Sequence, residues 1–142
     1  MKRYYLAGPM SNIPQFNFPA FDRACEVLRA AGFTIISPHE NDTPAVQDAA
    51  RASVDGKMDS AGKIAGETWP QILARDVILV GDETDGIIFL PDWQKSRGAK
   101  LEAFTGLLCG KEFGAFIDSP GAEPVEWVQA DAIRDVLRKN MP

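Results

Sequence analysis

The sequence contains few cysteines, a single histidine and no long apolar run. Its two cysteines, Cys25 and Cys109, lie within apolar helical patterns, which predicts buried free thiols and argues against a disulfide framework. No apolar run approaches the roughly 18 residues that a membrane-spanning helix needs. The N-terminus also lacks the apolar region of a signal peptide. We therefore expect a soluble, cytoplasmic protein that makes no contact with a membrane.

Positive charge is scarce and dispersed. The formal net charge is −5, and no run of Lys and Arg exceeds two residues. Binding of nucleic acid polymers depends on clustered Lys and Arg, so this class of partner is not expected, whereas a small anion needs only one or two donors. No Gly-x-Gly-x-x-Gly or P-loop pattern is present, so no nucleotide cofactor is expected. His39 lacks metal-ligating partners at a suitable spacing, and a structural role is the commoner one for a lone histidine.

Strand and helix patterns alternate along the chain. With 142 residues, of which 45% are apolar, the chain is predicted to form one domain (1–142) with a substantial core. The alternation predicts an α/β fold with a parallel sheet of four to five strands flanked by helices, although no pattern places the fifth, edge strand. The predicted strands are Arg3–Ala7, Phe33–Ser37, Gly86–Leu90 and Phe113–Ile117. The predicted helices run from Asn17 to Gly32, Pro44 to Ser53, Thr68 to Gly81, Ser96 to Gly110 and Glu126 to Leu137.

Two segments are harder to interpret. Val77–Val80 alone would suit a strand, but the length of the pattern from Thr68 to Gly81 favours a helix. Within it, Asp76 is predicted to be partly buried among apolar residues, the alternative being a solvated helix charge. The segment His39–Glu67 is the least regular, and we expect a lid or specificity segment there because long loops in compact domains are usually functional or mobile.

The segment Ser96–Glu102 begins the helix that follows the predicted strand Gly86–Leu90. Ser96 is a predicted N-cap, so free backbone N–H groups would face a ligand at the carboxyl end of the sheet. Glu102 shares a helix face with Gly98, which leaves space in front of the carboxylate. Such a carboxylate can be a nucleophile, but acidic residues near helix starts are also common as solvated charges.

Four motifs in the same order resemble the nucleoside 2-deoxyribosyltransferase-like superfamily, and more narrowly its small DUF4406 branch. They are Tyr5–Met10, Asp76, Leu90–Trp93 and Ser96–Glu102. The similarity covers most of the chain and is weakest between about residues 41 and 67. The resemblance implies a single Rossmann-like (flavodoxin-like) domain. Members include nucleoside 2-deoxyribosyltransferases and deoxynucleoside 5′-monophosphate N-glycosidases, which cleave the bond between a base and a deoxyribose.

The resemblance also implies roles for individual residues. Glu102 takes the position of the nucleophile, which forms a glycosyl-enzyme ester. Tyr5 matches the tyrosine that orients it, and Asp76 matches the acid that assists the departing base. Ser96 matches a serine that binds the 5′-phosphate, and Asp92 falls in the loop that supplies a sugar-contacting acid. The other expected substrate-binding residues are Gly8, Met10, Trp93, Arg97 and Gly98.

Several of these assignments have alternatives. Trp93 either stacks on a base or packs in the core, and Gly8 either clears space for a sugar or serves the Gly-Pro turn. The monophosphate hydrolases carry a serine and an arginine where this chain has Pro9 and Ser11. Arg97 either replaces that phosphate contact or is a surface charge. A nucleotide is therefore favoured only modestly over a free nucleoside.

The expected function is cleavage of an N-glycosidic bond, by hydrolysis or by base transfer. A carboxylate that traps the sugar as a covalent ester follows the logic of retaining glycosidases. A second acid with a raised pKa would protonate the departing base. The resemblance also implies a homo-oligomer in which a neighbouring subunit completes the pocket. The alternatives are a non-catalytic nucleotide-binding or sensing module, and a scaffold for partner contacts.

Overall fold

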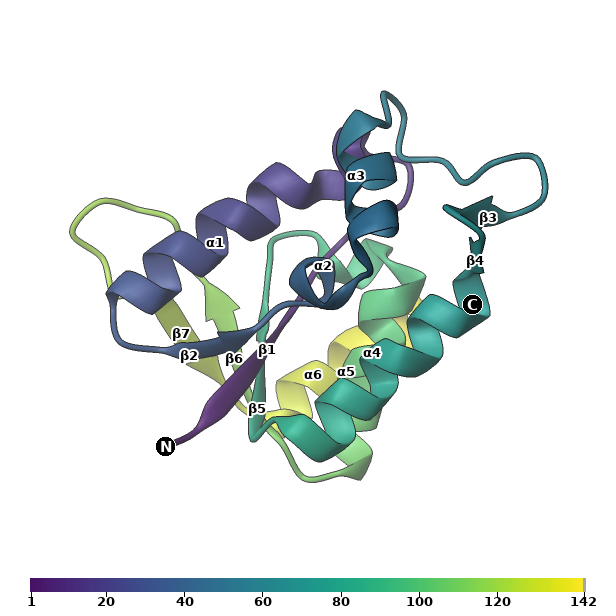
Figure 1. Cartoon of the computed structure of the whole chain (residues 1–142). Coiled ribbons are helices and arrows are strands. Elements are labelled where there is room, and N and C mark those ends of the chain that lie inside the picture. The colour runs from purple at the N-terminus through teal and green to yellow at the C-terminus, as the bar shows by residue number, and fades with distance from the viewer. Residues whose placement is uncertain (142) are drawn as a thin grey trace.

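The computed structural model describes residues 1–141 and contains one five-stranded sheet in the order β2-β1-β5-β6-β7 (Figure 1). The first four strands are parallel, and β7 pairs antiparallel with β6. The predicted Rossmann-like α/β fold is confirmed. The elements are β1 (Arg3–Ala7), η1 (Pro14–Asn17), α1 (Phe18–Ala30), β2 (Thr34–Ile36), α2 (Pro38–Asn41), α3 (Pro44–Ala52), β3 (Lys63–Ile64), β4 (Glu67–Thr68), α4 (Trp69–Glu83), β5 (Gly86–Phe89), η2 (Trp93–Lys95), α5 (Arg97–Leu108), β6 (Glu112–Phe116), β7 (Val125–Val128) and α6 (Ala130–Asn140).

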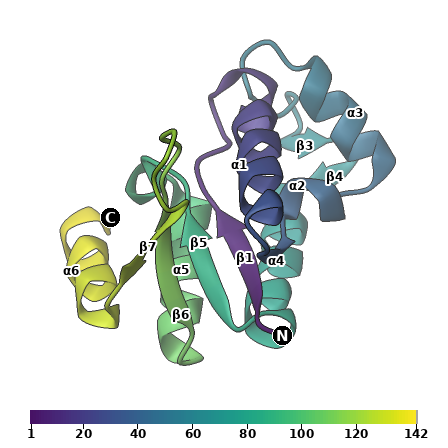
Figure 2. The same ribbon diagram turned by 90° about the vertical axis from the view of Figure 1, so that its left-hand side faces the viewer.

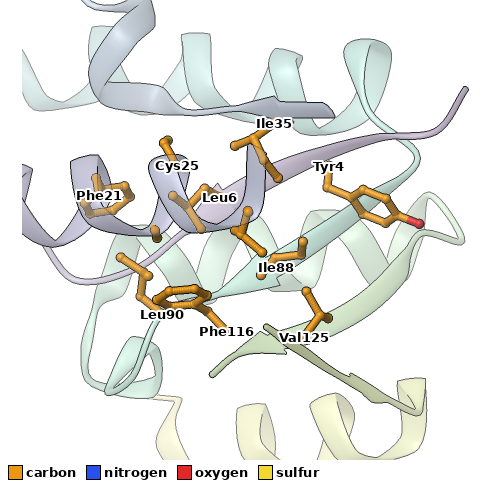
Figure 3. Packing of buried hydrophobic residues seen from close by; sticks show 11 residues of the cluster. Tyr4, Leu6, Phe21, Cys25, Ile35, Ile88, Leu90, Phe116 and Val125 are labelled. Atoms are coloured by element: carbon orange, nitrogen blue, oxygen red, sulfur yellow. The ribbon is translucent and has the colours of Figure 1, made fainter. Parts of the chain in front are cut away.

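Strand β1 divides its side chains between two cores, because successive residues of a strand point to opposite faces. Tyr4 and Leu6 face α1 (Figure 3), whereas Tyr5 and Ala7 pack in a second cluster with residues of α4, α5 and α6. Figure 3 shows the first core, in which residues of α1 lie over β1, β2 and β5. Its labelled members are Tyr4, Leu6, Phe21, Cys25, Ile35, Ile88, Leu90, Phe116 and Val125. This alternation directs Tyr5 towards α5, the helix that carries Glu102.

Helix α5 packs on the sheet through small residues. Its buried positions are Gly98, Ala99, Glu102, Ala103 and Gly106, so Glu102 is the one long side chain on that face. The large apolar side chains of α5 are turned outward, with exposed fractions of 38% for Leu101, 46% for Phe104 and 72% for Leu108. The helix therefore has two apolar faces, of which the sheet covers only the one made of small side chains.

The C-terminal part differs from the prediction. Glu126–Val128, expected in the closing helix, belongs to the antiparallel edge strand β7, and α6 begins only at Ala130. Figure 2 shows β7 and α6 together at the edge of the sheet away from β1. Cys109 is exposed, which corrects the expectation of a buried thiol, whereas Cys25 is buried as predicted. Helix α4 continues past Gly81 to Glu83.

The segment His39–Glu67 is more regular than expected and lies near the carboxyl ends of the strands (Figure 1). It contains α3, which confirms the predicted helix, and the short antiparallel hairpin β3–β4. A third apolar cluster joins these elements to η1 and α1. Its members are Phe16, Phe18, Val46, Ala50 and Ile64. The role of a lid or specificity segment stays a prediction.

Side-chain hydrogen bonds cap α4 and α5, and the predicted N-cap Ser96 is confirmed. The hydroxyls of Thr68 and Ser96 accept from backbone N–H groups of Gln71 and Ala99 at 3.3 and 3.2 Å. Asn17 precedes α1 as predicted, but its side chain donates to the carbonyl of Pro9. Within residues 1–141, no helix combines the length and the apolar character that crossing a membrane requires.

Candidate active site

Three adjoining cavities lie where β1 and β5 end and where α4 and α5 begin. The outer cleft has a volume of about 280 Å³, an inner pocket about 40 Å³, and an apolar pocket beneath α3 about 30 Å³. Met10, Ser11 and Trp69 line all three. This is the position at which ligands bind in open α/β sheets, outside the carboxyl ends of parallel strands.

The outer cleft is suited to an anion. Lys95 and Arg97 line it beside Ser96, the N-cap of α5. The first N–H groups of a helix have no partner within the helix, and the helix dipole favours negative charge there. Ser11 lines the cleft opposite, whereas Asp92 adds one negative charge that pairs with Lys95 at 3.4 Å. The cleft therefore combines two cations, two hydroxyls and a helix N-terminus.

The inner pocket brings two acidic side chains together. Glu102 from α5 and Asp76 from α4 both line it, with exposed fractions of only 5% and 8%. The hydroxyl of Tyr5, itself fully buried, donates a hydrogen bond to Oε2 of Glu102. Oδ1 of Asp76 has no hydrogen-bond partner. Glu102, whose carboxylate accepts a hydrogen bond from Tyr5, thus shares a small pocket with Asp76, whose Oδ1 accepts none.

Burial raises the pKa of both acids, and their mutual repulsion adds to this effect on Glu102. The pKa of Asp76 reaches about 7, first through burial and then through the charge of Asp42. The hydrogen bond from Tyr5 acts in the opposite direction on Glu102 alone, because it stabilises the ionised form. The two acids therefore titrate as one interacting pair. The hydrogen bonding favours the charge on Glu102 and the proton on Asp76.

Residues 2–113 match the family model described as "Domain of unknown function (DUF4406)". The chain belongs to this family. No curated protein matches it. Tyr5, Asp76 and Glu102 all lie within the part of the DUF4406 chain that the family model covers, whereas β7 and α6 lie outside it.

The DUF4406 structure brings most of the predicted site residues together. Met10, Asp92, Ser96, Arg97 and Gly98 line the outer cleft. Gly8 lines the inner pocket and approaches Leu90 so closely that an added Cβ would lie 2.8 Å from its Cβ. The hydrogen bond between Tyr5 and Glu102 places Tyr5 directly behind the carboxylate.

Two expectations need correction. Trp93 lines none of the three cavities, because its ring stacks on Phe89 with a centroid distance of 4.2 Å. Substrate contact by Trp93 is therefore not proposed. The space in front of Gly98 is not free either, since the indole of Trp69 fills it. Trp69 received no site role from the sequence, because its contact with Gly98 depends on the packing of α4 against α5.

An ion-pair network supports the inner pocket from behind. Arg75, next to Asp76 on α4, contacts Asp42 and Glu67 at 2.8 Å each. Asp42 is largely buried and lines the apolar pocket. Its negative charge is one reason for the raised pKa of Asp76, which the positive charge of Arg75 partly offsets. The network thus fixes both ends of the segment between Asp42 and Glu67 to α4.

One group of potential metal ligands lies elsewhere. Cys25, His39 and Glu40 each place a ligand atom within 4.8 Å of the others. Both ring nitrogens of His39 already contact side-chain oxygens, namely Ser37 Oγ at 2.5 Å and Asp22 Oδ1 at 2.8 Å. Arg29 holds Glu40 through two hydrogen bonds of 2.8 and 2.6 Å. The arrangement is that of a packed structural network, as expected for the lone histidine.

Replacing Asp76 by Asn tests the buried charge. The folded-state pKa of Asp76 is about 7, above the ordinary 3.8, so the contribution of Asp76 to stability is fully present below about pH 4 and is lost as pH rises through 7. One pKa unit corresponds to about 1.4 kcal/mol, which makes the loss on the order of 4 kcal/mol. Because Asn does not ionise, we expect Asp76→Asn to melt near the wild-type temperature at pH 4 and above it at pH 8.

Thermal denaturation followed by circular dichroism measures both melting temperatures. Asp82→Asn, an exposed position on the same helix, is the matched control and should follow the wild type at each pH. Melting curves of Asp76→Asn that differ from the wild type by the same amount at pH 4 and pH 8 would contradict the raised pKa.

Proposed function

We propose that the protein cleaves the N-glycosidic bond of a 2-deoxynucleoside or its 5′-monophosphate, with Glu102 as the nucleophile. The proposal rests above all on the buried pair of Glu102 and Asp76 in one pocket, with Tyr5 holding Glu102. The resemblance to nucleoside 2-deoxyribosyltransferases supplies the reaction class. The pair has the two properties that the reaction needs, an oriented carboxylate and an acid with a pKa near 7.

In the proposed first step, an oxygen of Glu102 bonds to the anomeric carbon while the bond from that carbon to the base nitrogen breaks. The bonding electron pair leaves with the base, which receives a proton from Asp76. The second step reverses this sequence. Water or another base attacks the anomeric carbon, the ester electrons return to Glu102, and ionised Asp76 takes the proton of the attacking group. Two inversions give net retention at the sugar.

The outer cleft supports a 5′-phosphate on the substrate. Arg97 and the N-terminus of α5 lie on the same helix as Glu102, and Lys95 belongs to η2 directly before it. A substrate that places its sugar over Glu102 therefore has an anion site next to it. The hydroxyl of Ser11 also lines this cleft, although the resemblance implies an arginine in that turn. Because this anion site lies beside the position of the sugar, the monophosphate is the favoured substrate.

One observation favours the alternative of a nucleotide-binding module without catalysis. The inner pocket, at about 40 Å³, is far smaller than the outer cleft of about 280 Å³. Ligand pockets typically span roughly 300–1,000 Å³, so the cleft alone approaches that range and the inner pocket does not. A nucleotide bound only in the outer cleft would not reach Glu102. The assay below distinguishes the two functions.

The first test is base release by wild-type protein and Glu102→Gln. The substrates are the four common 2-deoxynucleosides and their 5′-monophosphates, and chromatography detects the free base. Loss of a covalent nucleophile commonly costs several orders of magnitude, so we expect at least about a 10³-fold decrease in kcat. Glu26→Gln, an exposed position on α1, is the matched control and should retain wild-type rates.

Equal base release by the wild type and Glu102→Gln would refute the proposed nucleophile. A wild type that releases no base from any substrate, yet melts at a higher temperature with a monophosphate, would establish the binding module instead. A screen with neither turnover nor a thermal shift would leave the role of a scaffold for partner contacts.

The second test concerns the phosphate. Hydrogen bonds to charged groups contribute about 1.5–3 kcal/mol, so Arg97→Ala should raise KM for monophosphates roughly 10- to 100-fold. The KM for free nucleosides should stay unchanged, because they place no charge in the outer cleft. Steady-state kinetics on matched pairs of substrates measures this difference. Arg134→Ala on α6 is the control, and equal losses on both substrate types would refute the phosphate site.

The protein is further proposed to form a homo-oligomer through the outer face of α5. Leu101, Phe104 and Leu108 are exposed there, on the helix whose opposite face carries Glu102. A second copy that covers this face would bury these side chains, and the resemblance implies such a homo-oligomer. The compartment is proposed to be the cytoplasm, where the free thiols of Cys25 and Cys109 stay reduced.

Light scattering after gel filtration tests the oligomer. We expect a wild-type mass of at least twice the 15.5 kDa of one chain, and a monomer for Leu108→Glu, because a buried charge opposes association. Val54→Glu changes another exposed apolar side chain and should keep the wild-type mass. A wild-type protein of 15.5 kDa would refute the oligomer.

A further inference from the structure

Trp69 occupies a central position among the three cavities. It is the first residue of α4, and its indole lies against Gly98, the second residue of α5. A Cβ added to Gly98 would lie 2.9 Å from Cη2 and 3.4 Å from Cζ2 of Trp69. Gly98 has no side chain, so the indole lies directly against the backbone of α5. There it forms a wall of the outer cleft and of the inner pocket.

The inner pocket is too small for a substrate, so part of its lining has to move before a sugar can reach Glu102. A volume of about 40 Å³ holds only a few water molecules, and a deoxyribose ring needs considerably more space. The sugar of any substrate that reaches Glu102 must therefore displace part of the lining. The other lining residues include Gly8 and Gly98, which have no side chain to move, and Met10, which packs against the apolar cores.

Trp69 is the lining residue best able to move. Met10 packs against two apolar clusters and Ile72 against one, whereas Trp69 and Leu73 belong to none of the three. Of these two, only Trp69 also lines the outer cleft. The indole can leave Gly98 by rotation of its own side chain, without a change in the helix. Its displacement would join the inner pocket to the outer cleft.

Helix α4 also indicates where the base would lie. Trp69, Ile72, Leu73 and Asp76 follow helical spacing and all line the inner pocket. Glu102 and the anion site are on α5, so the sugar and phosphate belong to that side. Asp76 must lie near the base in order to protonate it. The base then lies along α4, where the indole provides an aromatic surface for stacking.

We infer that Trp69 is a specificity-determining residue that separates Glu102 from the outer cleft in the free protein, leaves Gly98 when a nucleotide enters, and stacks on the base. The inference rests on the proposed function for its substrate class. Its first consequence, the shielding of Glu102, does not depend on catalysis. The shielding and the proposed function can therefore fail separately.

Chemical labelling measures the shielding directly. A water-soluble carbodiimide with glycinamide as the nucleophile converts accessible carboxyl groups to amides, and mass spectrometry quantifies the product at Glu102. We expect Trp69→Ala to label at least about 10-fold faster than the wild type. Trp127→Ala removes an exposed indole from β7 and is the matched control, which should label at the wild-type rate. Equal rates in all three folded proteins would refute the shielding.

Kinetics on the 5′-monophosphates measures the stacking. Stacking of a base on an aromatic ring commonly changes affinity by roughly 10- to 100-fold, so KM should rise by that factor in Trp69→Ala. Trp69→Phe keeps an aromatic ring and should recover most of the affinity. Failure of Phe to restore KM, or a KM unchanged in Trp69→Ala, would refute the stacking.

The labelling and kinetic results also separate this inference from the proposed function. Faster labelling of Trp69→Ala in a protein that releases no base would confirm the shielding and refute the glycosidase. Base release by the wild type, with equal labelling of Glu102 in Trp69→Ala and in the wild type, would support the glycosidase and refute the shielding. Circular dichroism verifies that each variant is folded before it is compared.

Discussion

The candidate site depends on one hydrogen bond, which the hydroxyl of Tyr5 donates to the carboxylate of Glu102. It joins the strand β1 to the helix α5 inside the second core, where neither group contacts bulk water. A buried carboxylate without a donor would be strongly destabilising, so this contact makes the placement of Glu102 tolerable. Asp76 lacks such a donor, so hydrogen bonding stabilises the ionised form of Glu102 alone.

Much of the fold could be predicted because its main strands are short apolar runs bounded by Gly and Pro. Strand β7 could not, because its exposed Glu126 and Trp127 leave no continuous apolar run. The spacing of Val128, Ala132 and Val136, four residues apart, also suits a helix. An edge strand is defined mainly by the neighbour with which it pairs, here β6, and that information is not local.

The site was predictable where it depends on local chemistry. Ser96 caps its helix and Asp76 is buried, as the neighbouring residues indicated. That Asp76 and Glu102 share a pocket followed only from the family resemblance, because the packing of α4 beside α5 determines it. The same packing explains why Trp69 was missed and why Gly98 was assigned open space. Both errors concern one contact between two helices.

The guanidinium of Arg75 allows the length of one segment of the chain to vary. It binds Asp42, just before α3, and Glu67, just before α4, so a single side chain clamps both ends of the intervening segment. Insertions or deletions between these anchors need not shift the acids beneath them, since the cost of a longer loop grows only slowly with its length. The residues between Asp42 and Glu67 can therefore vary in sequence and length while Asp76 and Glu102 keep their positions.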